Sequence, residues 1–87
     1  MALTYMVIVE SGLNNQSAYV PDIPGCVTTG RTTAETMSNM QEALQMHLEG
    51  MIEDGDPIPV PSTHHVDLDP GDSVHHISIN ISAHVTP

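Results

Sequence analysis

The sequence predicts an α+β fold: a single sheet in the order β-β-β-α-β, with one crossover helix packed on it. Three short apolar segments precede one long amphipathic segment, and one alternating segment follows it. Apolar residues recur every two positions in the last segment and every three or four in the long one, the periods of a strand and a helix. With 87 residues the chain holds one core, so we expect a single domain over 1–87.

Three antiparallel strands are expected in the first third of the chain. Residues 3–10 form a continuous apolar run with β-branched side chains, which is typical of a strand buried on much of both faces. Turn formers at 11–15 close this run and predict a hairpin to a second strand at 16–20. A third short strand is expected at 26–31, ending near Gly30.

The helix is the most regular element. Thr32 and Glu35 have the spacing of a capping box, in which each side chain satisfies a free backbone N–H. Gly55 is suited to the C-terminal cap, and Pro57 prevents continuation. The predicted buried face consists of Met37, Met40, Leu44, Leu48 and Met51, flanked by Ala43 and Ile52.

A proline-rich connector at 56–73, with an extended piece expected around Val66, leads to the last strand, predicted at about 73–83. Odd-numbered positions from His75 to Ala83 form its predicted inner face. If this strand runs parallel to its neighbour, the crossover is expected to be right-handed.

Charge is the clearest signal of the composition: eleven acidic residues stand against one cation, Arg31. Nucleic-acid binding requires cationic groups that displace counterions from phosphate, so direct binding to DNA or RNA is not expected. An anionic protein attracts basic partners. The alternative is that the charge serves only solubility.

The core has neither Phe nor Trp, and a chain this small gains stability by burying more surface against a copy of itself. We therefore expect a homo-oligomer, either a dimer or a tetramer. The first residues lack the basic region of a secretory signal, and no apolar stretch approaches the roughly 20 residues that span a bilayer. A cytoplasmic protein without a membrane segment is expected.

Catalysis, cofactors and metal sites are not expected. The pairs at 64–65 and 75–76 are adjacent histidines, which point to opposite faces of a strand and chelate poorly together. Cys26 has no partner for an internal disulfide and no close basic residue to lower its thiol pKa, so a buried, inert thiol is expected. His47 is expected to be partly buried beside the apolar face of the helix. The acids fall mostly outside the strands, which favours a solvated surface over a magnesium site.

The segment YVPDIPGCVTTGRT, residues 19–32, raises the question of a catalytic or a structural loop. Pro21 and Pro24 fix backbone angles, Asp22 has a carboxylate for local N–H groups, and Gly25 tolerates a conformation closed to other residues. We interpret it as structural. The residues expected to have an architectural role are Pro21, Pro24, Gly25, Cys26, Gly30, Gly55, Pro57 and Pro59.

Three motifs in order resemble the HicB-like antitoxin family: PDIPGC at 21–26, TTGRT at 28–32 and LEGMIEDGDPIP at 48–59. The resemblance covers about residues 5–62. It implies a truncated RNase H-like fold without that superfamily's catalytic carboxylates. It also implies a role: such proteins neutralise small, basic, mRNA-cleaving HicA-like toxins by covering the active site or the RNA surface.

Many members of the family carry a C-terminal DNA-binding domain, which is not expected here because the chain ends soon after the last strand. The partner contacts are predicted from exposure and charge near the motif loops: Tyr19, Asp22, Glu53, Asp54 and Asp56. One alternative function is an orphan structural or regulatory oligomer without a toxin. Another is a metal-dependent hydrolase, which would require purified protein to carry stoichiometric metal.

Overall fold

The computed structural model describes residues 2–81. Its elements are β1 (Ala2–Ser11), β2 (Gln16–Tyr19), β3 (Val27–Gly30), α1 (Thr33–Glu53) and β4 (Ser73–Asn80). The strands form one sheet in the order β3-β2-β1-β4, and all neighbours are antiparallel. The β-β-β-α-β prediction is therefore confirmed, and the case of a parallel last strand does not arise. The predicted end of that strand at Ala83 lies outside the described residues.

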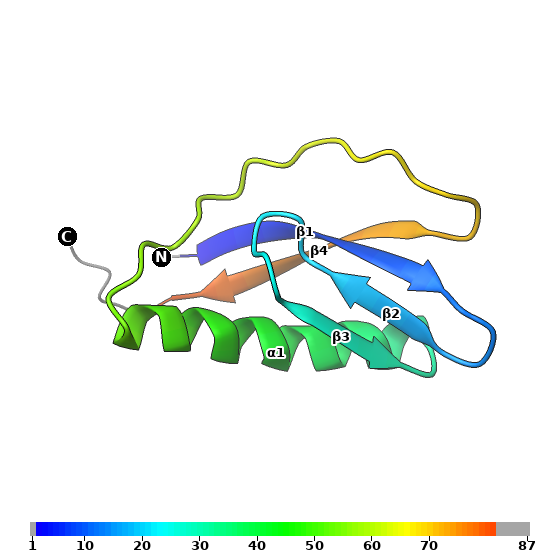
Figure 1. Cartoon of the computed structure of the whole chain (residues 1–87), viewed down its shortest axis with the longest axis horizontal. Coiled ribbons are helices and arrows are strands. Elements are labelled where there is room, and N and C mark those ends of the chain that lie inside the picture. The colour runs from blue at the N-terminus through cyan, green and yellow to red at the C-terminus, as the bar shows by residue number, and fades with distance from the viewer. Residues whose placement is uncertain (1, 82–87) are drawn as a thin grey trace.

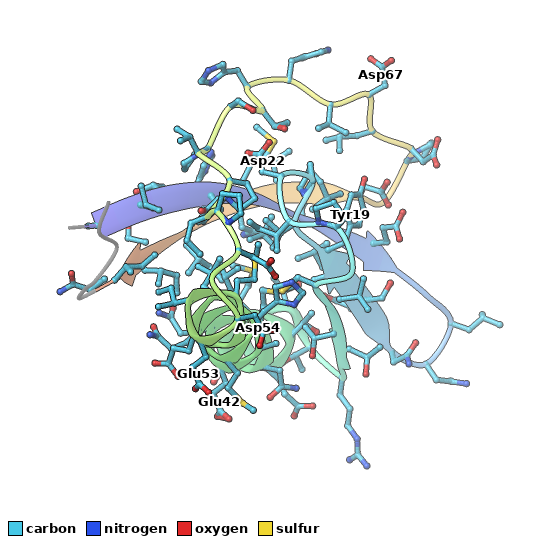
Figure 2. The ribbon with its side chains drawn as sticks, turned by 60° about the vertical axis from the view of Figure 1, so that its left-hand side comes forward. Tyr19, Asp22, Glu42, Glu53, Asp54 and Asp67 are labelled. Carbon is cyan, nitrogen blue, oxygen red and sulfur yellow. The ribbon has the colours of Figure 1, made fainter. Side chains whose placement is uncertain are left out.

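The central strand β1 is buried on both faces, as its unbroken apolar run predicts. Tyr5, Val7 and Val9 belong to the core under α1 and are at most 2% exposed. Met6 and Ile8 point to the opposite face and are 7% and 1% exposed. Their cover is the connector, here called the strap (residues 54–72), which crosses the side of the sheet away from α1 (Figures 1 and 2). The strap contains no strand, so the extended piece expected around Val66 is not an additional strand.

The helix buries the side that its periodicity predicts. Met40, Leu44 and Leu48 are at most 1% exposed and pack in the core. The other predicted members of this face, Met37 and Met51, and the flanking Ala43 and Ile52 are partly buried against the same core. Thr36 is also fully buried, which the sequence pattern did not predict. Its hydroxyl donates to Thr32 O at 2.8 Å, so the burial leaves no unsatisfied polar atom there.

Both helix ends are capped by the predicted residues, with one difference. Glu35 N donates to Thr32 Oγ1 at 3.0 Å, but the Glu35 carboxylate accepts from the N–H of Arg31. A capping box would pair this carboxylate with the N–H of Thr32, so the observed hydrogen bond is made one residue earlier in the chain. At the other end Gly55 has a φ of +77°, and the bonds from Gly55 N to Ile52 O and from Asp56 N to Met51 O form a Schellman motif. Among the described residues, no helix is both long enough and apolar enough to cross a membrane.

Candidate partner-binding surface

The outward side of α1 carries negative charge along its whole length. Glu35, Glu42, Glu49 and Glu53 are all exposed, and spacings of seven and four place them in one stripe opposite the buried residues. Figure 2 shows Glu42 and Glu53 pointing away from the sheet. No Lys or Arg occurs in α1 to neutralise them. These four glutamates are called the acidic face below.

An apolar side chain lies in the middle of the acidic face. Met46 is 69% exposed, and with Gln41, Glu42 and Gln45 it lines a shallow hollow. A methionine is flexible and adapts its shape to an apolar partner surface. The exposed Met46 was not predicted from the sequence, although the helical period places it on the side opposite Met40 and Leu44.

Three of the five predicted contact residues come together at the C-terminal end of α1. Glu53 is the last helical residue, Asp54 is the C-cap and Asp56 follows Gly55, and all three acids are exposed. The free carbonyls at a helix C-terminus carry partial negative charge, so each acid there is unfavourable by roughly 0.3–1 kcal/mol at low salt. No basic residue occupies the last turn to offset this. A cationic partner at this end would therefore relieve repulsion that the isolated chain retains.

The Asp22 carboxylate is hydrogen-bonded to other residues of the chain. Its carboxylate accepts hydrogen bonds from the backbone N–H groups of Ser62 and Thr63 at 3.0 and 3.1 Å and from their hydroxyls at 3.2 and 2.6 Å. Burial alone would raise the pKa of Asp22, but these hydrogen bonds outweigh it and hold the pKa below its ordinary value. The expectation that Asp22 bonds local N–H groups was wrong, because the groups that it holds lie on the strap.

Tyr5 fastens the strap at a second point. Its hydroxyl donates to the Pro59 carbonyl at 2.6 Å. Burial raises the pKa of Tyr5, and the negative charge of Asp22 raises it further. Ser11 supplies a third fastening at the far end, where its hydroxyl donates to Gly71 O at 3.0 Å. The strap is thus tied to the sheet and the β2–β3 loop along its length.

Tyr19 lies on the strap side of the sheet, since its neighbours Ala18 and Val20 face the core. It is half-buried in a cross-strand row that runs Val27, Tyr19, Ile8, Val74. Figure 2 shows Tyr19 and Asp22 on the strap side and Glu53 and Asp54 on the helix side. The five predicted contact residues therefore do not form one patch.

A hydrogen-bonded backbone turn sets the conformation of the β2–β3 loop. Cys26 N donates to Ile23 O at 3.2 Å, closing a turn with Pro24 and Gly25 at its centre. Gly25 has a φ of +87°, which a type II turn requires at that position. Ile23 is 1% exposed, so the turn is anchored in the core.

The residues considered for chemistry are dispersed. Cys26 is 3% exposed, and burial raises the pKa of its thiol, the opposite of what a nucleophile needs. His47 is partly buried beside the Gly25 turn. His65 lies 3.4 Å from Asp67, both exposed on the strap. Within residues 2–81 no three His, Cys, Asp or Glu side chains gather as a metal ion would require.

Comparisons with known proteins identify the family. The model of the HicB-like antitoxin of bacterial toxin-antitoxin systems matches residues 5–83. An uncharacterized 14.9 kDa protein of Haemophilus phage HP1 is 39% identical over 57 residues, and a UPF0150 protein of Synechocystis is 32% identical over 56. These matches cover 66% and 63% of this chain. They span 43% of the phage protein and 71% of the Synechocystis protein.

Two solved structures share the fold. The N-terminal domain of Burkholderia pseudomallei antitoxin HicB superposes with a TM-score of 0.76 and 26% identity, covering 91% of this chain and all of that one. A chain of the HicA3 and HicB3 toxin-antitoxin complex superposes with a TM-score of 0.66 and 26% identity. The match covers 85% of this chain and 94% of that one. The RNase H-like relationship implied by the motifs stays a prediction. The chain belongs to the HicB-like antitoxin family of bacterial toxin-antitoxin systems.

Proposed function

We propose that this chain is an antitoxin that binds a small, basic, HicA-like toxin and prevents it from cleaving mRNA. The observation that carries the proposal is the family match over 5–83, supported by the likeness to a chain of a HicA3–HicB3 complex. In this role the chain is a non-catalytic binding protein, acting in the cytoplasm where mRNA is cut. The chain would prevent cleavage by covering either the toxin's active site or its RNA-binding surface.

The surface proposed for the toxin is the acidic face together with Asp54 and Asp56. An RNA-cleaving protein needs cationic groups to hold phosphates, and the same groups complement a row of carboxylates. Met46 supplies an apolar contact within that row. Tyr19 and Asp22 lie on the other side of the sheet, so a toxin that also contacts them must reach around the end of α1.

The proposal is tested with a HicA-like toxin, taken from the adjacent reading frame if that frame encodes a short basic protein, purified and incubated with RNA. Adding this chain should stop cleavage at a fixed stoichiometry, and the two proteins should co-elute. Substituting Glu42→Gln, Glu49→Gln and Glu53→Gln together should raise the amount required for inhibition. Cleavage that continues at a large excess of this chain, with no co-elution, would support the orphan oligomer instead.

A further inference from the structure

We propose that Met46 is an oxidation site that regulates toxin binding. A peroxide converts its thioether to the sulfoxide in the free chain, and the oxidised chain binds the toxin more weakly. This regulation rests on the proposed function, because Met46 lies in the surface proposed there for the toxin. The oxidation step itself requires only this chain and the oxidant.

Met46 is the one exposed methionine among residues 2–81. Its exposed fraction is 69%, against 7% for Met6 and 0% for Met40. Met37 and Met51 are partly buried against the core. A sulfur atom reacts only where the oxidant can reach it, so Met46 should be oxidised first in the folded chain. Hydrogen peroxide is uncharged, so the strongly negative charge of the chain does not repel it.

Met46 lies in the same stripe of α1 as the glutamates of the acidic face. It follows Glu42 by four residues and precedes Glu49 by three, the spacings at which side chains are neighbours on a helix. It also lines the shallow hollow formed with Gln41, Glu42 and Gln45. An apolar toxin side chain in this hollow would contact the flexible thioether of Met46 directly.

The reaction is a two-electron oxygen transfer. A lone pair of the Met46 sulfur attacks one oxygen of hydrogen peroxide and the O–O bond breaks. The proton on the transferred oxygen passes to the departing hydroxide, which leaves as water. The sulfur is thereby oxidised to the sulfoxide and the peroxide is reduced. Methionine sulfoxide reductases reverse the step with two electrons from a pair of thiols, which become a disulfide while the oxygen leaves as water.

Oxidation would weaken binding because it places a polar S–O group in an apolar contact. The sulfoxide is hydrated in the free chain, and a toxin side chain in the hollow would displace that water. The fold should be unaffected, since the Met46 side chain is exposed and lies outside the core. A bound toxin would cover Met46, so the oxidant acts on the free chain and prevents it from binding.

The first measurement uses this chain alone. It is treated with hydrogen peroxide for a series of short times, the peroxide is destroyed with catalase, and each methionine is followed by peptide mass spectrometry. Met46 should be oxidised at least about fivefold faster than Met6 or Met40, with an unchanged circular dichroism spectrum. Equal rates at these three methionines would overturn the assignment of the site.

The second measurement is the affinity of the oxidised chain for a HicA-like toxin that has not been exposed to peroxide. The dissociation constant of wild type should rise at least about tenfold after oxidation and recover after incubation with sulfoxide reductases and dithiothreitol. Met46→Leu removes the oxidisable sulfur, so its dissociation constants before and after peroxide should agree within about twofold, whatever its own affinity. Met51→Leu is the matched control, since it removes a partly buried methionine of the same helix and should keep the tenfold response.

The outcomes separate this regulation from the proposed function. Wild type that binds the toxin equally well before and after oxidation of Met46 would overturn the regulation and leave the antitoxin role intact. A loss of affinity that persists in Met46→Leu would also overturn it, because another methionine would then be responsible. If unoxidised wild type does not bind the toxin, the proposed function fails and the regulation fails with it.

Discussion

The Asp22 carboxylate holds Thr63, 41 residues further along the chain, through two hydrogen bonds. Thr63 Oγ1 donates to Oδ1 at 2.6 Å and Thr63 N donates to Oδ2 at 3.1 Å. Ser62 makes the same pair of contacts, so one side chain in the β2–β3 loop accepts four bonds from the strap. This contact is the main polar link between the PDIPG turn and the cover over Met6 and Ile8.

Replacing Asp22 with Asn should weaken the fold. The amide has no charge and one acceptor oxygen in place of two, so it can accept from the two backbone N–H groups but not also from the two hydroxyls, at a cost of about 1–2 kcal/mol. Urea unfolding followed by circular dichroism measures the loss. Asp67→Asn is the control, because that exposed acid on the same strap should change the free energy of unfolding by less than about 0.5 kcal/mol. Equal effects of both substitutions would show that the strap contact adds no stability.

The same contact predicts a dependence on pH. Because the pKa of Asp22 in the folded chain lies below its ordinary value of 3.8, the ionised carboxylate stabilises the fold fully well above pH 3.8. As the pH falls through the folded-state pKa, that contribution is lost. The difference in unfolding free energy between wild type and Asp22→Asn should therefore shrink on acidification. A difference that stays constant or grows between neutral pH and pH 3 would contradict the assigned pKa direction.

Two glycines provide a matched pair. A Cβ at Gly30 would lie 2.5 Å from Thr36 Oγ1 and 2.7 Å from Thr36 N, and the backbone atom cannot move aside easily. Gly30→Ala should cost about 2–3 kcal/mol. Gly50 lies in the helix with nothing within 4 Å of such a Cβ, so Gly50→Ala should stabilise by about 0.5–1 kcal/mol. Urea midpoints that move in the same direction for both variants would refute the packing assigned to β3 and α1.

The Cys26 thiol should be unreactive in the folded chain. It is buried against Met40, with its Sγ 3.7 Å from Met40 Sδ, and its pKa is raised by burial. Alkylation by iodoacetamide, followed by mass spectrometry, should be at least about tenfold slower in the native chain than in urea. Similar rates in both states would reopen the possibility of a reactive thiol.

The fold was predictable from the sequence because local signals agreed with one another. The period of Met40, Leu44 and Leu48 defined the helix, Thr32 and Gly55 marked its ends, and the alternation around Ile77 and Ile79 defined β4. Burial of Thr36 was not predictable, because it depends on the absence of a side chain at Gly30 on another element. The link from Asp22 to Thr63 was missed for a similar reason: a contact across 41 residues leaves no local pattern.

The exposed acids of the candidate surface were predicted only in part. Glu53, Asp54 and Asp56 were chosen for their charge and expected exposure near the motif loops, and all three are exposed. The glutamates at 35, 42 and 49 were interpreted as a solvated surface. Their common orientation with Met46 becomes evident once the buried side of the helix is known. Whether they contact a toxin stays a prediction.

The most direct test of the proposed role is the affinity of this chain for a HicA-like toxin, measured by isothermal titration calorimetry at low and high salt. We expect a complex with fixed stoichiometry whose affinity falls as salt rises. We also expect about tenfold weaker binding when Glu42, Glu49 and Glu53 are changed to Gln. The matched control, Glu10→Gln with Asp67→Asn and Asp69→Asn, removes the same number of charges away from α1 and should retain affinity. No binding, or binding unaffected by salt and equal in both variants, would contradict the proposed role.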